Sequence, residues 1–242
     1  MLYLYRIYQF FIAAPLLILI TVITALVTTV GCTLGSAHFW GYWPGRIWSR
    51  WFMRILLLPV HIEGYEHINH QTSYVFVANH QGAFDIFLIY GYLNRNFKWM
   101  MKSALRQAPL IGKACESAGH IFVDKSGPKA IQRTHDRARE VLTDGTSLVV
   151  FPEGERTLTG KMGPFFRGAY QLADELQLPI VPITINGSYR VLSRQRGPVN
   201  FVFYHPLSLT IHRPIYPIGK GADNIRHLME TSREAIASGL NE

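Results

Sequence analysis

The heptapeptide Asn79-His-Gln-Gly-Ala-Phe-Asp85 places a histidine and a carboxylate five positions apart, directly after the apolar run Tyr74-Val-Phe-Val-Ala78. Partners on one face of a helix are three or four residues apart, so this spacing does not suit a continuous helix. It suits a strand that ends before His80 and a helix that begins near Asp85, with Gly82 giving the turn between them freedom to fold back. The carboxylate would hold one imidazole nitrogen as a donor and leave the other free to accept a proton. Because the motif has no serine or cysteine, it predicts a general base that acts on a hydroxyl group of the substrate.

A second charged loop, Phe151-Pro-Glu-Gly-Glu-Arg-Thr157, follows another apolar run that begins at Ser147. Ligand sites collect at the carboxyl ends of parallel strands, so this loop is expected beside His80. Arg156 offers a planar, permanently charged fork that suits a phosphate group. Glu153 could orient that arginine or a substrate hydroxyl. Taken alone, however, each of these two loops also fits an ordinary charged surface.

Two lysines are further candidates for contact with a phosphate group. Lys125 ends the segment Gly119-His-Ile-Phe-Val-Asp-Lys125, and Lys102 stands near the start of a predicted helix. The histidines at positions 61, 67 and 70 match no common metal-ligand spacing, and the chemistry predicted for His80 needs no metal, so no metal site is expected.

The elements that must position these residues alternate along the chain from about residue 59. Predicted strands cover residues 74–78, 121–123, 147–151, 180–185, 200–203 and 207–211, and predicted helices cover 84–93, 128–143, 166–176 and 222–240. Several strands are apolar throughout, which is typical of strands that are covered on both faces. The pattern predicts an α/β domain over residues 59–242, built around a largely parallel sheet.

The first 58 residues have a different character. Between Ile7 and Gly45 the chain contains no Asp, Glu, Lys or Arg. The apolar stretch 10–30 would give about 31 Å of helix, enough to cross a bilayer, so a membrane anchor is favoured. A cleaved signal, in lipoprotein form because of Val30-Gly-Cys32, and a buried core helix are the alternatives. Cys32 and Cys115 suggest no disulfide framework.

An aromatic and basic segment follows the apolar stretch. Arg46, Arg50 and Arg54 are four residues apart and would form one stripe of a helix, with four tryptophans nearby at positions 40, 43, 48 and 51. Tryptophan favours the headgroup region and arginine favours anionic phosphates, so an interfacial helix is expected after the anchor. The positive-inside tendency then places residues 59–242 on the cytoplasmic face of the cell's inner membrane. The net charge of +8 fits anionic lipid better than nucleic acid, because no lysine-rich tail or zinc-finger spacing is present.

Four stretches of the chain resemble, in order, the four sequence blocks of the glycerolipid acyltransferase family, in particular its bacterial 1-acylglycerol-3-phosphate acyltransferases. The stretches are residues 79–85, 119–124, 151–156 and 180–184. The resemblance implies an αβ sandwich with a membrane-associated amino end. It implies transfer of a fatty acyl group from an acyl-carrier-protein or coenzyme A thioester to the sn-2 hydroxyl of lysophosphatidic acid, giving phosphatidic acid, with no cofactor beyond the thioester donor.

The same resemblance assigns roles by position. His80 would be the general base and Asp85 its partner. The acceptor phosphate site would include Glu153, Gly154 and Arg156. An acyl or acceptor pocket would be shaped by Val181, Pro182 and Ile183.

The chain departs from the family pattern at three positions. Glu155 stands where threonine is usual, Thr157 replaces a serine, and Lys125 replaces an arginine. These departures leave open a different lysolipid acceptor. Two other classes also remain open: a hydrolase that uses His80 with a distant serine, although no Gly-x-Ser-x-Gly elbow is present, and a membrane-anchored lipid-binding module without catalysis.

Overall fold

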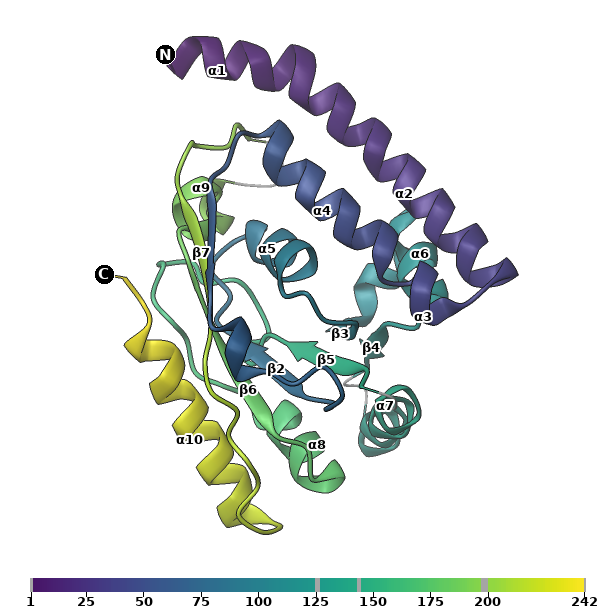
Figure 1. Ribbon diagram of the computed structural model, residues 1–242, viewed down its shortest axis with the longest axis vertical. Helices are drawn as coiled ribbons and strands as arrows, with labels where there is room; N and C mark the ends of the chain where they lie inside the picture. Colours follow the sequence, from purple (N-terminus) through teal and green to yellow (C-terminus); the bar gives the residue numbers. More distant parts are fainter. Residues whose placement is uncertain (1, 125–126, 143–144, 197–199, 242) are drawn as a thin grey trace.

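A computed structural model describes residues 2–124, 127–142, 145–196 and 200–241. Its described residues form one seven-stranded sheet in the order β1-β7-β6-β2-β5-β3-β4 (Figure 1). All neighbouring strands are parallel except β6 and β7, so the predicted α/β fold with a largely parallel sheet is confirmed. The strands are β1 (Val60–Glu63), β2 (Val75–Ala78), β3 (Phe97–Lys102), β4 (Ile121–Val123), β5 (Ser147–Val150), β6 (Ile180–Asn186) and β7 (Leu207–Ile211).

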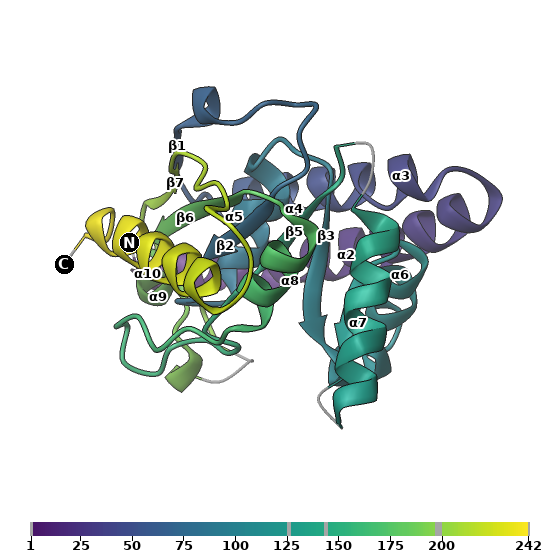
Figure 2. The ribbon, with the colours of Figure 1, turned by 90° about the horizontal axis from the view of Figure 1, so that it is seen from below.

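Helices cover both faces of the sheet (Figures 1 and 2). Helices α4 (Trp43–Ile55) and α5 (Phe84–Tyr92) lie on one face, and α7 (Pro128–Val141), α8 (Gly168–Leu176) and α10 (Ala222–Ser238) lie on the other. The central strands are buried throughout because alternate side chains enter the two cores. The remaining helices are short: α3 (Ala37–Trp40), α6 (Ile111–Ser117), α9 (Ser188–Val191) and the 3-10 turns η2 (Tyr65–His67), η3 (Ser103–Gln107) and η4 (Arg194–Arg196).

Three sequence predictions about the elements are wrong. The predicted strand at 200–203 is absent, and this segment is extended without joining the sheet. Strands β1 and β3 form where no strand was predicted. Lys102 ends strand β3 and directly precedes the short 3-10 helix η3, so its predicted place near the start of a helix is confirmed.

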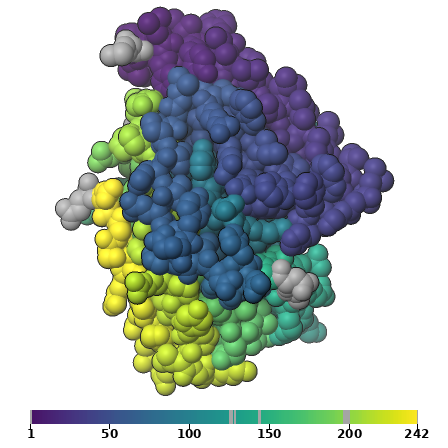
Figure 3. Space-filling model, viewed as in Figure 1, coloured from purple at the N-terminus to yellow at the C-terminus, as the bar shows by residue number. Residues whose placement is uncertain are grey.

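The amino-terminal segment forms one long helix made of α1 (Leu2–Tyr8), the π-turn η1 (Gln9–Ala13) and α2 (Ala14–Leu34). It is long and apolar enough to cross a membrane, and only 11% of its most apolar window is buried. The buried-core alternative is therefore wrong. Figure 3 shows this helix, in purple, lying over α4 along the outside of the molecule.

Side chains fix the long helix to its neighbours near both ends. The Tyr5 and Tyr8 hydroxyls donate to the carbonyls of Leu56 and Ile55 at 2.6 and 2.7 Å. Towards the other end, a side chain at Gly31 would meet the Trp40 ring at 2.5 Å, so α3 packs directly on the helix backbone. The boundary expected at residues 58–59 falls between α4 and β1, and the division into two domains stays a prediction.

Candidate active site

His80 and Asp85 are joined by a hydrogen bond at the carboxyl edge of the sheet. His80 follows β2, Asp85 lies in the first turn of α5, and the imidazole Nδ1 is 2.7 Å from Asp85 Oδ2. The Asp85 side chain is fully buried, whereas 13% of the His80 side chain is exposed. A buried carboxylate facing Nδ1 favours the tautomer with a proton there, which leaves Nε2 to accept a proton from a substrate. The predicted geometry of the five-residue spacing is confirmed.

The turn between the two residues is fixed by a close approach to helix α9. The Gly82 N–H donates to Asp85 Oδ2 at 2.9 Å, so this oxygen serves both the turn and the imidazole. A Cβ at Gly82 would lie 2.5 Å from Ser188 Oγ and 2.7 Å from the Ser188 carbonyl oxygen. Only glycine fits here, because the contact is partly with backbone.

Asn79 fixes the end of strand β2. Its side-chain Nδ2 donates to the Ile185 carbonyl at 2.9 Å, and its Oδ1 accepts the Ile185 N–H at 2.8 Å. The amide thereby continues the pairing of β2 with β6 by one more residue, where the backbone has already turned toward His80. This bond pair fixes the backbone directly before His80.

The imidazole of His80 is stacked on Phe151, with ring centroids 3.8 Å apart and planes 8° from parallel. Phe151 in turn stacks on Trp99 of β3. Sequence reasoning treated Phe151 as the end of a strand and missed this contact. The stack restricts rotation of the imidazole, while Asp85 fixes its hydrogen-bonding edge.

Glu153 connects the two charged loops through backbone groups. Its Oε1 accepts the His80 N–H and its Oε2 accepts the Gly163 N–H, both at 2.7 Å. The expected role of orienting Arg156 is wrong, because the carboxylate holds backbone and forms no ion pair with Arg156 in the described structure. Burial raises the pKa of Glu153, against the two backbone N–H groups that lower it.

Arg156 lies in the loop that Glu153 anchors to the His80 turn. The N–H of the next residue, Thr157, donates to the His80 carbonyl at 2.8 Å, so Arg156 is one residue from a direct contact with the turn. Its neighbour Glu155 points to Arg194, at 2.8 Å, and not to Arg156. Gly154 has a φ of +73°, which favours glycine, and faces Phe166. No carboxylate among the described residues pairs with the Arg156 guanidinium, which leaves it available for an anion.

The other candidate residues lie at different distances from this centre. Lys102 is exposed at the carboxyl end of β3, on the same edge of the sheet as His80. Lys125 lies outside the described residues. Val181, Pro182 and Ile183 are buried in β6, which pairs side by side with β2, the strand that precedes His80. Their expected part in an acyl or acceptor pocket stays a prediction.

A second buried polar cluster lies at the opposite, amino-terminal edge of β3 and β4. His120 Nδ1 accepts the Trp99 N–H at 3.2 Å, and Lys98 Nζ donates to the Ala118 carbonyl at 2.7 Å. Burial, aided by the positive charge of Lys98, lowers the pKa of His120 to about 3. Burial also lowers the pKa of Lys98. His120 is therefore a neutral structural residue.

Comparison with known proteins places the chain in a family. Residues 59–186 match the model of the Acyltransferase family. A chloroplastic 1-acyl-sn-glycerol-3-phosphate acyltransferase of Brassica napus is 31% identical over 181 residues, which are 74% of this chain and 50% of that protein. The alpha form of the mouse enzyme of the same name is 30% identical over 199 residues, 78% of this chain and 69% of that protein. The chain spans about half the length of the plant relatives it matches.

The fold is shared with a solved structure. The 1-acyl-sn-glycerophosphate acyltransferase PlsC of Thermotoga maritima superposes with a TM-score of 0.77 over 98% of this chain and 93% of that one, at 23% sequence identity. At that identity the likeness speaks for the fold alone. The family match, which runs from strand β1 through strand β6 and includes His80, decides the classification: this chain belongs to the Acyltransferase family.

Proposed function

We propose that this protein transfers a fatty acyl group from a thioester to the sn-2 hydroxyl of lysophosphatidic acid, giving phosphatidic acid. The observation that carries the proposal is the buried Asp85–His80 pair, with Nε2 left as the accepting nitrogen. Family membership and the names of the relatives support the same acceptor.

The proposed reaction follows from this pair. Nε2 of His80 takes the proton of the acceptor hydroxyl while the oxygen attacks the thioester carbonyl. The tetrahedral intermediate collapses, the new ester forms, and the thiolate leaves and recovers the proton from the imidazolium. Asp85 stabilises the positive charge that the ring carries between these two steps.

Arg156 is the proposed contact for the acceptor phosphate. It has no carboxylate partner among the described residues, and its loop is tied to the His80 turn by Glu153 and by the Thr157 N–H. Binding the acceptor by its phosphate holds its hydroxyl near His80, so that the reaction no longer depends on a chance collision in the correct orientation. Lys102 is a further candidate on the same edge, and Lys125 stays a prediction from the sequence.

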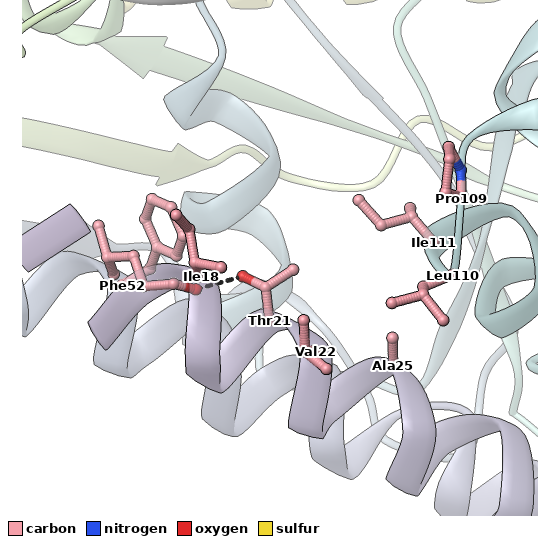
Figure 4. A pocket seen from close by; sticks show the side chains of 9 residues that line it. Ile18, Thr21, Val22, Ala25, Phe52, Pro109, Leu110 and Ile111 are labelled. Carbon is pink, nitrogen blue, oxygen red and sulfur yellow. Dashed lines mark hydrogen bonds between the residues drawn. The ribbon is translucent and has the colours of Figure 1, made fainter. Parts of the chain in front are cut away.

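An apolar cavity of about 270 Å³ offers a place for a hydrocarbon chain (Figure 4). It lies between α2 and the residues that precede α6, and its wall includes Phe52 of α4. Phe52 stacks on Phe87 of α5, the helix that carries Asp85, so the cavity borders the framework of the site. Its lining is Leu17, Ile18, Thr21, Val22, Ala25, Phe52, Pro109, Leu110 and Ile111. We expect an acyl chain to enter here from the lipid around α2.

The packing of the long amino-terminal helix bears on how the protein meets a membrane. The helix is hydrogen-bonded near its amino end to Leu56 and to Val202, and near its other end Gly31 packs on the Trp40 ring, so the helix lies along the rest of the molecule and does not project from it. A helix that crosses the bilayer would draw the domain into lipid. We therefore propose that it lies in one face of the membrane, with its exposed apolar side in lipid and the catalytic domain on the cytoplasmic side.

The test is turnover by the purified full-length protein in mixed vesicles. Labelled acyl-carrier-protein and coenzyme A thioesters are supplied with lysophosphatidic acid or with lysolipids that have other headgroups, and the product is identified. Phosphatidic acid formed by the wild type and absent with the His80→Ala variant supports the proposal, and the two donors are compared directly. Release of free fatty acid only would indicate a hydrolase, and binding without turnover would indicate a lipid-binding module.

A further inference from the structure

Residues 200–204 form an extended segment that is attached to the amino-terminal helix. The Gln9 side chain is buried, its Nε2 donates to the Val202 carbonyl, and its Oε1 accepts the Val202 N–H, both at 2.9 Å. The two bonds resemble those between neighbouring strands, but one partner is the Gln9 side chain and the other is a backbone 193 residues away. On its other side, the Phe203 N–H donates to the Val191 carbonyl of α9 at 3.0 Å. The segment is thus held between the helix and the catalytic domain.

Phe201 and Tyr204, near Val202 in the chain, carry aromatic rings that the protein covers only in part. Phe201 is 36% exposed and Tyr204 is 61% exposed. Tyr3, one helical turn before the Arg6 that lies over the Phe201 ring, is 78% exposed. Leaving large aromatic side chains in water forfeits the free energy of burying them, so a fixed cluster of them calls for something that covers it.

Arg6 adds a positive charge to this cluster. The Arg6 guanidinium lies 5.7 Å from the centre of the Phe201 ring, and no carboxylate of the described chain forms an ion pair with it. A cation beside aromatic rings is typical of the region where a bilayer presents its headgroups. The cluster is also continuous with the exposed apolar side of the helix, where Leu4 and Ile7 lie in the same turns.

We propose that Phe201, Tyr204, Tyr3 and Arg6 form a second membrane contact, through which the catalytic domain itself binds a lipid surface with anionic headgroups. Figures 1 and 3 show the yellow-green segment after α9 lying next to the purple amino end of the helix. The inference rests on the proposed membrane placement of that helix, and it adds a contact from the other end of the sequence. The segment is bonded to α9, and α9 packs against the Gly82 turn of the active site. Such a contact would therefore fix the orientation of the active site relative to the lipid surface.

Tyr216 provides a matched control on the same protein. It is 62% exposed, almost the same as Tyr204, but it lies between β7 and α10, and α10 covers the face of the sheet opposite to α4 (Figure 1). If exposure alone decided lipid contact, the two tyrosines would behave alike. If the proposal is right, only Tyr204 meets the bilayer.

The experiment places one fluorescent reporter at a time on the full-length protein. In a Cys32→Ser, Cys115→Ser background, Phe11→Cys, Tyr204→Cys and Tyr216→Cys are each labelled with a polarity-sensitive dye. Phosphatidylcholine vesicles with and without phosphatidylglycerol are then added. We expect a blue shift at positions 11 and 204, larger with the anionic lipid, and none at 216. A shift at 11 with none at 204 overturns this inference and leaves the helix placement intact. No shift at 11 overturns the membrane placement itself.

A second measurement uses affinity. Replacing both rings in a Phe201→Ser, Tyr204→Ser variant should weaken vesicle binding by about 10- to 100-fold, given the apolar area that they expose. Tyr216→Ser should leave binding unchanged, and Arg6→Gln should lower binding about 5-fold to anionic vesicles only. Unchanged binding by the double variant, with an unchanged melting temperature, would also overturn the inference.

Discussion

The Asp85→Asn substitution is the sharpest probe of the active site, because it removes a charge and preserves shape. Asp85 Oδ2 accepts two N–H groups, from His80 and Gly82, while Oδ1 is buried without a hydrogen-bond partner in the described structure. An asparagine can keep both bonds by placing its oxygen at the Oδ2 position. The fold should therefore tolerate the change, and the loss should fall on the step in which His80 becomes positively charged.

The magnitude follows from the distance between the two groups. Two unit charges 4 Å apart interact by about 4 kcal/mol at the effective dielectric of a protein site, and Nδ1 and Oδ2 are closer than that. About 4 kcal/mol corresponds to a factor of roughly 10³ in rate, within the range of 10²–10⁴ that general-base help contributes. We expect kcat to fall by that factor, with the KM for lysophosphatidic acid changed little.

The assay is steady-state acyl transfer by the full-length protein in vesicles, with thermal unfolding measured in parallel. Asp174→Asn is the matched control. Asp174 also accepts hydrogen bonds from an N–H and a side-chain amide, at Gly221 and Asn224, but it lies on α8 on the opposite face of the sheet from α5. It should lose stability and keep its kcat. The His80→Ala, Asp85→Asn double variant should be no slower than His80→Ala alone, since the two residues act as one unit. An Asp85→Asn protein with wild-type kcat would refute the assigned mechanism.

Three further predictions concern Gly82, His120 and Arg156. Gly82→Ala should lower kcat by at least about 10-fold, since its Cβ would meet the Ser188 backbone oxygen at 2.7 Å. Adding Ser188→Gly to this variant should restore little of the lost kcat, because the backbone oxygen remains. Full activity of Gly82→Ala would show that the turn is not tightly held. The fold keeps the full benefit of a neutral His120 above about pH 6.5, and the free energy of unfolding should fall as the pH falls toward the folded pKa of about 3, by up to about 1.4 kcal/mol per pH unit. Denaturant unfolding across that range should show this pH dependence of the unfolding free energy in the wild type and not in His120→Asn. Arg156→Ala should lower kcat/KM for lysophosphatidic acid by about 10- to 150-fold, Arg156→Lys should recover part of it, and an effect confined to saturation by the thioester would assign Arg156 to the donor.

The relation of His80 to Asp85 could be predicted from sequence because it is local. The end of the apolar run at Ala78 and the glycine at position 82 determine where the strand stops and how the turn folds back. The stack on Phe151 could not be predicted, because an aromatic residue at the end of an apolar run has the same pattern whether it enters the core or faces a site. Glu153 was misassigned for a related reason. Sequence shows a carboxylate in a charged loop, but the N–H of His80 that it binds is 73 residues away.

Two errors in the predicted elements have the same non-local origin. Strand β3 was missed because Lys98 interrupts its apolar pattern, yet Lys98 is buried and its ammonium reaches the Ala118 carbonyl. The segment 200–203 has the composition of a strand, but its backbone pairs with the side chain of Gln9. Composition indicates that a backbone will be extended and partnered. It does not indicate which group, at the other end of the chain, will be the partner.

Among the candidate site residues, Glu155 speaks most against an acceptor with a phosphate group, since a carboxylate beside Arg156 would repel that phosphate. The structure resolves this conflict by pairing Glu155 with Arg194 at 2.8 Å, and the same guanidinium also donates to the Arg156 carbonyl at 3.3 Å. Both partners are partly exposed, so the pair adds little to stability, at most about 1 kcal/mol. Its effect is on charge: Arg194 neutralises the Glu155 carboxylate, and Arg156 has no carboxylate partner among the described residues. The departure from the family pattern at this position is therefore compatible with an anionic acceptor, because the chain supplies the second arginine that compensates for it.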